Sequence, residues 1–419
     1  MLITHWIGAV MTPMPTATRD AGLKLLADFV PRMGRRYANG RNFDHGPGRH
    51  DAVSQLSPFV RRRIVTEAEL VGAAIVAHGP EDAEKFIEEV FWRGYFKGWL
   101  ERRPSVWAAY VAGLSADLAA LEGDRRLCRR VAEAQEGRTG LACFDAWAKE
   151  LDETGYLHNH ARMWFASIWI FTLGLPWRLG ADFFYRHLLD GDAASNTLGW
   201  RWVAGLHTRG KPYPAQAWNI ATFTGQRFTP RDSDLAEVTQ GLEAQEPGGL
   251  PPAQSLRSVL APEPGRPTGL LFTDEDCRLE DFDLAGLDIR ACATLAASPL
   301  RSPLPVSDAI IRFEAAALAD AAARAGPAGL AARALQADAP DNLVAWAVRA
   351  GVSQIATPYV TQGPLHDWLA QAAPLLAARG ITLREFQRDW DRLIWPHASA
   401  GFFKVKQQIP QILERVRCL

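Results

Sequence analysis

The stretch from His158 to Trp202 places polar side chains that can hold one ligand among many indoles. Its polar members carry amide, guanidinium or carboxylate groups: Asn159, Arg162, Asp190, Asp192 and Asn196. The indoles among them belong to Trp164, Trp169, Trp177, Trp200 and Trp202. Charged and amide groups fix the orientation of a bound molecule, and a protein supplies this kind of setting to a redox cofactor. The segment therefore predicts a redox cofactor with aromatic side chains around it.

The whole chain is nearly neutral and long enough for more than one core. Its 419 residues exceed the usual size of one domain, so we expect two. With 46 Lys and Arg against 47 Asp and Glu, any contact with DNA would depend on a local patch. Five scattered cysteines without CxxC spacing predict no metal site. The N-terminal apolar run is too short for a signal peptide or a spanning helix, which predicts a cytoplasmic protein.

The first half of the chain has the apolar spacing of helices. Segments such as PEDAEKFIEEVFWRGYFKGWLERR place apolar residues at i, i+3, i+4 and i+7. Thr66 and Glu69 have the spacing of a capping box, and Pro80 stands at the start of a further helix. A region rich in Pro and Gly follows. We predict a helical domain over 1–244 and a linker over 245–269.

The remainder, 270–419, alternates short apolar runs with helical segments. TGLLFTDED, LDIRACATLA and VSQIATPYV are typical of buried strands, and longer segments such as SDAIIRFEAAALADAAARAG separate them. This alternation predicts a doubly wound α/β domain with a parallel sheet. Neither GxGxxG nor a Walker loop occurs in the chain, so the sequence offers no dinucleotide or phosphate-loop fingerprint.

The motifs of the helical half resemble those of one flavoprotein family. HNHARMW, LLDGDAASN and WRW are similar, in this order, to the segments HNR.RM, L.DGD.A.N and GGW.W of DNA photolyases and cryptochromes. The likeness covers about residues 36–214 and implies an all-helical photolyase-type domain with FAD as its cofactor. The segment REFQRDWDRLIWPHASAGFFKVKQQIP resembles the end of the family's α/β domain. That domain precedes the helical one in ordinary photolyases, so the resemblance implies an inverted domain order in this chain.

The resemblance implies a set of cofactor contacts. VSQLSP is similar to the phosphate loop TSRLSP, and a helix beginning after it would offer N–H groups to a diphosphate. Asp190 is expected to pair with Arg162 beneath the isoalloxazine, and Asn196 to face flavin N5. The implied cofactor-binding residues are Tyr37, Ser54, Gln55, Leu56, Ser57, Phe86, Glu89, Arg93, Tyr156, Asn159, Arg162, Asp190, Asp192, Ser195 and Asn196.

Other matching positions imply a DNA lesion as substrate. The likeness places Trp92, Trp202 and Met163 against a flipped pyrimidine dimer, with Glu89 and Asn159 hydrogen-bonded to it. Photolyases that act on (6-4) lesions carry two histidines at the positions of Asn159 and Met163, so a cyclobutane dimer is the expected lesion.

Several basic residues bear on this expectation. His158 is expected to be packed and His160 to face DNA. The basic residues Arg61, Arg62, Arg63, Arg209 and Lys211 are candidates for phosphate contacts or for solvated surface.

Trp200 and Trp177 match the inner two members of the family's electron relay. The third member should lie around 123–130, where this chain has no aromatic residue. The relay is therefore incomplete or follows another route, for which Trp164 and Trp169 are candidates. The alternative is that Trp177 and Trp200 serve only as core.

The leading hypothesis is light-dependent repair of cyclobutane pyrimidine dimers, with damaged DNA as partner and electron transfer from reduced FAD. The residues expected to act in it are Glu89, Trp92, Asn159, Met163, Trp177, Trp200 and Trp202. The alternative hypotheses are a cryptochrome-like blue-light receptor with a protein partner, and a scaffold without flavin.

Overall fold

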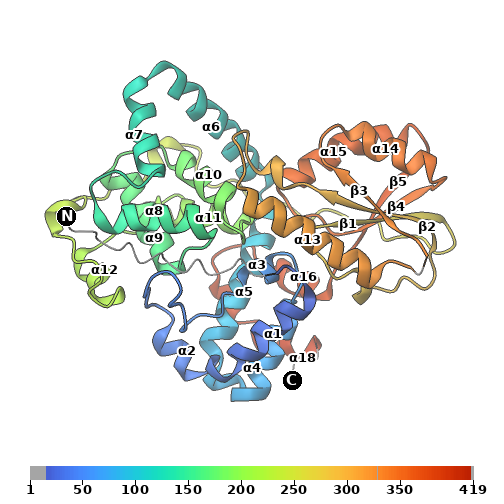
Figure 1. The fold of residues 1–419 in the computed structure, drawn as a ribbon, viewed down its shortest axis with the longest axis horizontal. Helices are drawn as coiled ribbons and strands as arrows, with labels where there is room; N and C mark the ends of the chain where they lie inside the picture. Colours follow the sequence, from blue (N-terminus) through green and yellow to red (C-terminus); the bar gives the residue numbers. More distant parts are fainter. Residues whose placement is uncertain (1–15, 328, 417–419) are drawn as a thin grey trace, which may run out of the picture.

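The computed structural model describes residues 16–327 and 329–416, which form a helical region and an α/β lobe (Figure 1). The helices of the first region are α1 (Arg19–Phe29), α2 (Arg35–Gly40), α3 (Ser57–Arg61), α4 (Glu67–Asp82), α5 (Glu84–Glu101), α6 (Pro104–Gly123), α7 (Arg125–Gln135), α8 (Ala142–Thr154), α9 (Asn159–Ser167), α10 (Trp177–His187), α11 (Ala193–Val203) and α12 (Ala217–Phe223). The expectation of a helical first half is confirmed.

Local signals in the sequence explain where α4 begins and bends. The hydroxyl of Thr66 accepts from the backbone N–H of Glu69, and the Glu69 carboxylate accepts from the N–H of Thr66, which completes the predicted capping box. Gly79 has a φ of 74° and interrupts the helix. Pro80 then starts its second piece, where a missing N–H costs nothing.

The lobe contains a five-stranded parallel sheet in the order β3-β2-β1-β4-β5. Its strands are β1 (Pro267–Thr273), β2 (Asp288–Ala296), β3 (Ala332–Gln336), β4 (Gln354–Pro358) and β5 (Thr382–Phe386), with the helices α13 (Asp308–Ala325), α14 (Pro340–Arg349) and α15 (Pro364–Ala377) between them. Leu270 and Phe272 belong to the core that α13 shares with the helical region, whereas Leu271 packs with α14 and α15. The sheet is doubly wound, as the alternating pattern predicts.

The segment after β5 returns to the helical region. It forms α16 (Asp389–Ile394), α17 (Phe403–Lys406) and α18 (Ile409–Arg415). A Cβ at Gly98 of α5 would lie 2.6 Å from Trp395 Cδ1, and one at Gly94 would lie 3.0 Å from Ile394 Cδ1. Glycine at these two positions lets the C-terminal segment lie directly on α5. The domain limits of 1–244 and 270–419 remain predictions.

The three arginines at the end of α3 join the two parts of the molecule. Arg61, Arg62 and Arg63 are all buried. Arg61 pairs with Asp274 and Glu275, which follow β1, and Arg63 Nη2 lies 2.6 Å from Asp391 Oδ1 of α16. The expectation that these arginines contact DNA phosphates or face solvent is wrong, because carboxylates from the lobe enclose them.

Candidate functional site

A partly buried ion pair connects two of the predicted site residues. Arg162 Nη2 of α9 donates to Asp190 Oδ2, 3.0 Å away, in the loop after α10. Burial alone would raise the pKa of Asp190, but Arg162 and the Ser57 hydroxyl together hold it below its usual value. Asp190 is therefore ionised at neutral pH. The expected pairing of Arg162 with Asp190 is present in the structure.

Polar atoms without partners surround this pair. Arg93 of α5 is close enough to lower the pKa of both Asp190 and Asp192. Its Nη1 atom and the Oδ1 atom of Asp190 are buried and have no hydrogen-bond partner among the described residues. A buried polar atom without a partner is costly. These two atoms are therefore suited to a polar ligand that would complete their hydrogen bonds.

Asp192 is the second buried carboxylate of the cluster. Its Oδ1 accepts from the N–H of Ser195 at 2.8 Å and so caps α11. Lys97 Nζ lies 3.7 Å from Asp192 Oδ2 and 3.7 Å from Glu275 Oε2. Although burial would raise the pKa of Asp192, Lys97 and Arg93 lower it strongly. Sequence reasoning missed Lys97, whose position four residues after Arg93 on α5 was the available signal.

Tyr37, Phe86 and Glu89, three further predicted site residues, connect α2 with α5. The rings of Tyr37 and Phe86 meet edge to face, with centroids 5.2 Å apart. Glu89 forms its ion pair with Arg41 at the end of α2. Burial raises the pKa of Glu89, and Arg41 opposes that rise. The contact of Glu89 thus joins α5 to α2 and is not a surface pair within α5.

The predicted phosphate loop has a tight backbone. Gln55 has a φ of 52°, the Ser54 hydroxyl accepts from the N–H of Leu56, and Leu56 is fully buried. Ser57 begins α3, and its hydroxyl is close enough to help lower the pKa of Asp190. The loop therefore reaches the same cluster as Arg162 and Arg93.

Five further predicted residues lie in other surroundings. Asn196 Nδ2 donates to the Ala181 carbonyl at 2.8 Å, which leaves Oδ1 available. Asn159 is exposed at the start of α9. The ring of Trp202 stacks on Tyr213, with centroids 5.3 Å apart. Met163 is half-buried against the core, and the Tyr156 ring lies beneath the Arg162 guanidinium.

Trp92 has a neighbour that sequence reasoning did not find. Its ring stacks on Phe402, which comes immediately before α17. Lys406 of α17 also pairs with Glu84 and Glu88 on α5. The C-terminal segment thus covers one face of the indole that the family likeness assigns to the lesion.

His158 and His160, at the start of α9, are both buried. His158 is fully buried and accepts from the N–H of His160, so it caps α9, and burial lowers its pKa to about 3. His160 Nδ1 lies 3.0 Å from the Asn42 carbonyl, and its ring stacks on Trp164. His158 is packed as expected, but the expectation that His160 faces DNA is wrong.

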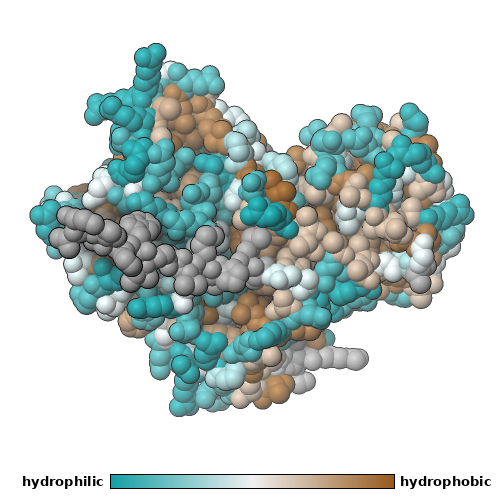
Figure 2. All heavy atoms as spheres, viewed as in Figure 1, coloured by the Kyte–Doolittle hydropathy of each residue, from teal (hydrophilic) through white to brown (hydrophobic). Residues whose placement is uncertain are grey.

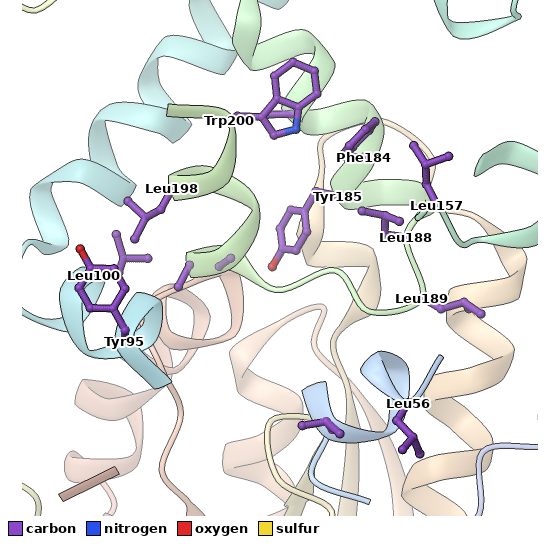
Figure 3. Close-up of a cluster of buried hydrophobic side chains, with 14 of the residues drawn as sticks. Leu56, Tyr95, Leu100, Leu157, Phe184, Tyr185, Leu188, Leu189, Leu198 and Trp200 are labelled. Carbon is purple, nitrogen blue, oxygen red and sulfur yellow. The ribbon is translucent and has the colours of Figure 1, made fainter. Parts of the chain in front are cut away.

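The tryptophans of the expected relay are buried in neighbouring helices. Trp200 of α11 lies beside Phe184 of α10, with ring centroids 5.1 Å apart, above Leu188 and Leu189 (Figure 3). Trp169 meets Trp200 edge to face at 6.3 Å, whereas the ring contacts of Trp164 are with Trp147 and His160. Of the two alternative routes, only the one through Trp169 is in ring contact with Trp200.

Comparison with known proteins identifies the helical region. A family model described as the FAD binding domain of DNA photolyase matches residues 86–232. The deoxyribodipyrimidine photo-lyase of Streptomyces griseus is 33% identical over 245 residues, or 55% of this chain and 49% of that protein. The protein of the same name from Thermus thermophilus is 34% identical over 48% of this chain and 46% of its own length. The helical region contains an FAD-binding domain of the photolyase/cryptochrome family.

Because residues 86–232 match an FAD-binding domain, the expectation of FAD as cofactor is confirmed. The chain spans about half the length of the curated relatives it matches. A solved class III photolyase from Agrobacterium tumefaciens aligns with a TM-score of 0.42 and 27% identity over 52% of this chain and 44% of that one. Tyr37 and the loop from Ser54 to Ser57 lie before the residues that the family model matches.

Within 16–327 and 329–416, no helix is long and apolar enough to cross a membrane. In the same ranges, no three His, Cys, Asp or Glu side chains are grouped so that they could hold a metal ion.

Proposed function

We propose that this protein is a light-driven FAD enzyme that splits cyclobutane pyrimidine dimers in DNA. The observation that carries the proposal is the cluster of Arg93, Arg162 and Asp190, in which the buried atoms Arg93 Nη1 and Asp190 Oδ1 have no hydrogen-bond partner within residues 16–327 and 329–416. An isoalloxazine or ribityl group offers the donors and acceptors that these atoms need. When bound, reduced FAD excited by blue light supplies the electron that opens the cyclobutane ring.

The residues of the chain would hold and orient the cofactor. The Arg162–Asp190 pair would fix the charge beneath the ring, and Lys97 keeps Asp192 ionised. Because Asn196 Nδ2 is committed to the Ala181 carbonyl, its Oδ1 would accept from a donor at flavin N5. Glu89, held by Arg41, would steady the dimer after the cofactor has bound.

The names of the relatives support the choice of substrate. The matched proteins of Streptomyces griseus and Thermus thermophilus are both called deoxyribodipyrimidine photo-lyase. Extrusion of a pyrimidine dimer from the duplex costs a few kcal/mol, and less for a damaged pair than for an intact one. Trp92 would provide the stacking surface, which requires Phe402 to move.

The second candidate function is a light-responsive flavoprotein that does not repair DNA. It is favoured by the stacking of Phe402 on Trp92 and by the burial of Arg61, Arg62 and Arg63, which removes them from any DNA-binding surface.

One experiment separates the two candidates. Fully reduced protein is illuminated with an oligonucleotide that contains one thymine dimer, and restored thymines are measured at low salt. We expect light-dependent repair. Failure to repair, together with equal affinity for damaged and intact DNA, would favour the light-responsive flavoprotein.

A further inference from the structure

A groove between the helical region and the α/β lobe ends at a buried indole. The groove has a volume of about 540 Å³ and is lined by α6 residues including Trp107 and Val111, and by Gln362 and Asp367 of the lobe. Figure 2 shows apolar side chains along α6 where the surface is notched between the two parts. Trp107 Nε1 donates to Asp367 Oδ2 of α15 at 2.7 Å.

Aromatic rings connect this indole to the expected relay. Trp177 and Tyr110 have ring centroids 5.9 Å apart, and Tyr110 and Trp107 have centroids 5.4 Å apart. Trp200 packs over Gly180, one helical turn along α10 from Trp177, because a Cβ at Gly180 would lie 2.3 Å from Trp200 Cη2. Ring contacts thus run from Trp177 of α10 to Trp107 of α6, and Trp200 of α11 packs on α10 one turn away from Trp177.

The hydrogen bonds of these rings differ in a way that gives the path a direction. An aromatic ring that loses an electron becomes a strong acid and is stabilised when its proton has an acceptor. Trp200 Nε1, Trp177 Nε1 and the Tyr110 hydroxyl are buried, and none has a hydrogen-bond partner in the described part of the chain. The Arg178 guanidinium also lies 5.0 Å from the Trp177 ring, which disfavours a positive charge there. Among the four rings of this path, it is Trp107 that donates its N–H to a carboxylate.

The competing branch through Trp169 lacks these features. Trp169 Nε1 donates to the Pro176 carbonyl, a neutral acceptor, and the other rings in contact with Trp169 are those of Phe144 and Phe165. Phenyl rings are much harder to oxidise than indoles. This branch therefore ends inside the core.

We propose that Tyr110 and Trp107 continue the electron relay outward from Trp177, and that Asp367 accepts the indole proton of Trp107. This inference rests on the proposed function, because light-excited FAD is the oxidant that starts the relay. An electron passes from Trp107 through Tyr110 to the oxidised Trp177. The N–H proton of Trp107 moves to the Asp367 carboxylate and leaves a neutral indolyl radical. A small-molecule thiolate that enters the groove from solution returns one electron and becomes a thiyl radical, and Asp367 returns the proton to the indole. Two such thiyl radicals then join as a disulfide.

The first test uses the FAD-loaded protein under blue light, with transient absorption and electron paramagnetic resonance to follow the tryptophan radical. Trp107→Phe should shorten the lifetime of the separated radical about tenfold or more, because the carboxylate-stabilised end of the path is lost. Asp367→Asn should give a protonated cation radical in place of the neutral one, and Asp367→Glu should restore the neutral form. Trp147→Phe is the matched control, since Trp147 is also buried and its Nε1 donates to the Asp44 carboxylate.

The second test needs no flavin. A ruthenium tris-bipyridine oxidant generated by flash-quench in solution withdraws an electron from the flavin-free protein, and the radical is assigned from the same variants. The neutral radical should disappear in Trp107→Phe and become protonated in Asp367→Asn. A neutral radical that both substitutions leave unchanged would overturn the proposal, as would a loss of lifetime in Trp169→Phe but not in Trp107→Phe. If the protein fails to bind FAD, the proposed function fails, while the flavin-free test still decides the roles of Trp107 and Asp367.

Discussion

The Trp92 and Phe402 rings lie face to face, with centroids 4.0 Å apart and planes inclined by 13°. A flipped base that stacks on Trp92 from this side must displace Phe402. An aromatic pair contributes about 0.5–1.5 kcal/mol beyond the burial of its area. Loss of the Phe402 contact therefore slightly lowers the affinity of any base that stacks on this face of Trp92.

Phe402→Ala should tighten binding of thymine-dimer DNA about fivefold, because roughly 1 kcal/mol of ring contact no longer competes with the lesion. The measurement is the Kd for a labelled oligonucleotide. Phe403→Ala is the control, since Phe403 is exposed and its neighbour Phe402 makes the contact with Trp92. Equal Kd values for Phe402→Ala and the unchanged protein would show that the lesion does not use this face.

Arg162→Ala should remove most of the FAD from the purified protein. It leaves Asp190 charged and buried, and loss of one partner of a buried pair costs about 3–5 kcal/mol. The ratio of flavin to protein absorbance measures the effect. Arg35→Ala removes an exposed pair with Asp82, worth about 0–1 kcal/mol, and should retain the cofactor. Full occupancy in Arg162→Ala would contradict the assignment of this pair to the flavin.

Trp200→Phe should slow light-driven reduction of the bound flavin by at least about tenfold, because the packing is nearly kept while the oxidisable indole is lost. Flash photolysis measures the rate. Trp164→Phe is the matched control, since Trp164 is equally buried and makes its ring contacts with Trp147 and His160. Unchanged kinetics in Trp200→Phe would mean that electrons enter elsewhere.

Stability should fall as the pH falls from about 6.5, the ordinary pKa of an unfolded histidine. Burial lowers the pKa of His158 to about 3 and that of His207 to about 4, so between these values and 6.5 the unfolded chain binds more protons than the folded one. Each such histidine removes about 1.4 kcal/mol of stability per pH unit in that window. His158→Asn keeps a residue that can cap α9 and should reduce the slope by about one proton. Urea unfolding midpoints at several pH values measure this slope, and equal slopes in both proteins would refute the prediction.

The elements of the fold were predictable because their signals are local. The alternation of residues 270 to 272 places Leu270 and Phe272 on one face of the sheet and Leu271 on the other, and the structure has this arrangement. The capping box of Thr66 and Glu69 involves residues three apart and forms as expected. Such patterns need no knowledge of distant parts of the chain.

The contacts that sequence reasoning missed come from distant parts of the chain. Three successive arginines are typical of a solvated surface, since arginine is seldom buried without a partner. The partners of Arg61 and Arg63 are Asp274, Glu275 and Asp391, which only the fold brings to α3. Phe402 reaches Trp92 in the same way. Lys97 was different, because its place on the same face of α5 as Arg93 was visible in the sequence.

The ion pairs of the buried arginines affect whether the two halves of the chain can be separated or exchanged between relatives. A recombinant fragment that ends in the linker would keep Arg61 and Arg62 without Asp274, and Arg63 without Asp391, at a cost of about 3–5 kcal/mol for a broken buried pair. Cleavage of the linker alone would leave every one of these pairs intact. The halves are therefore expected to remain associated after a proteolytic nick, and exchange of one half between relatives would succeed only if its charge partners were exchanged with it.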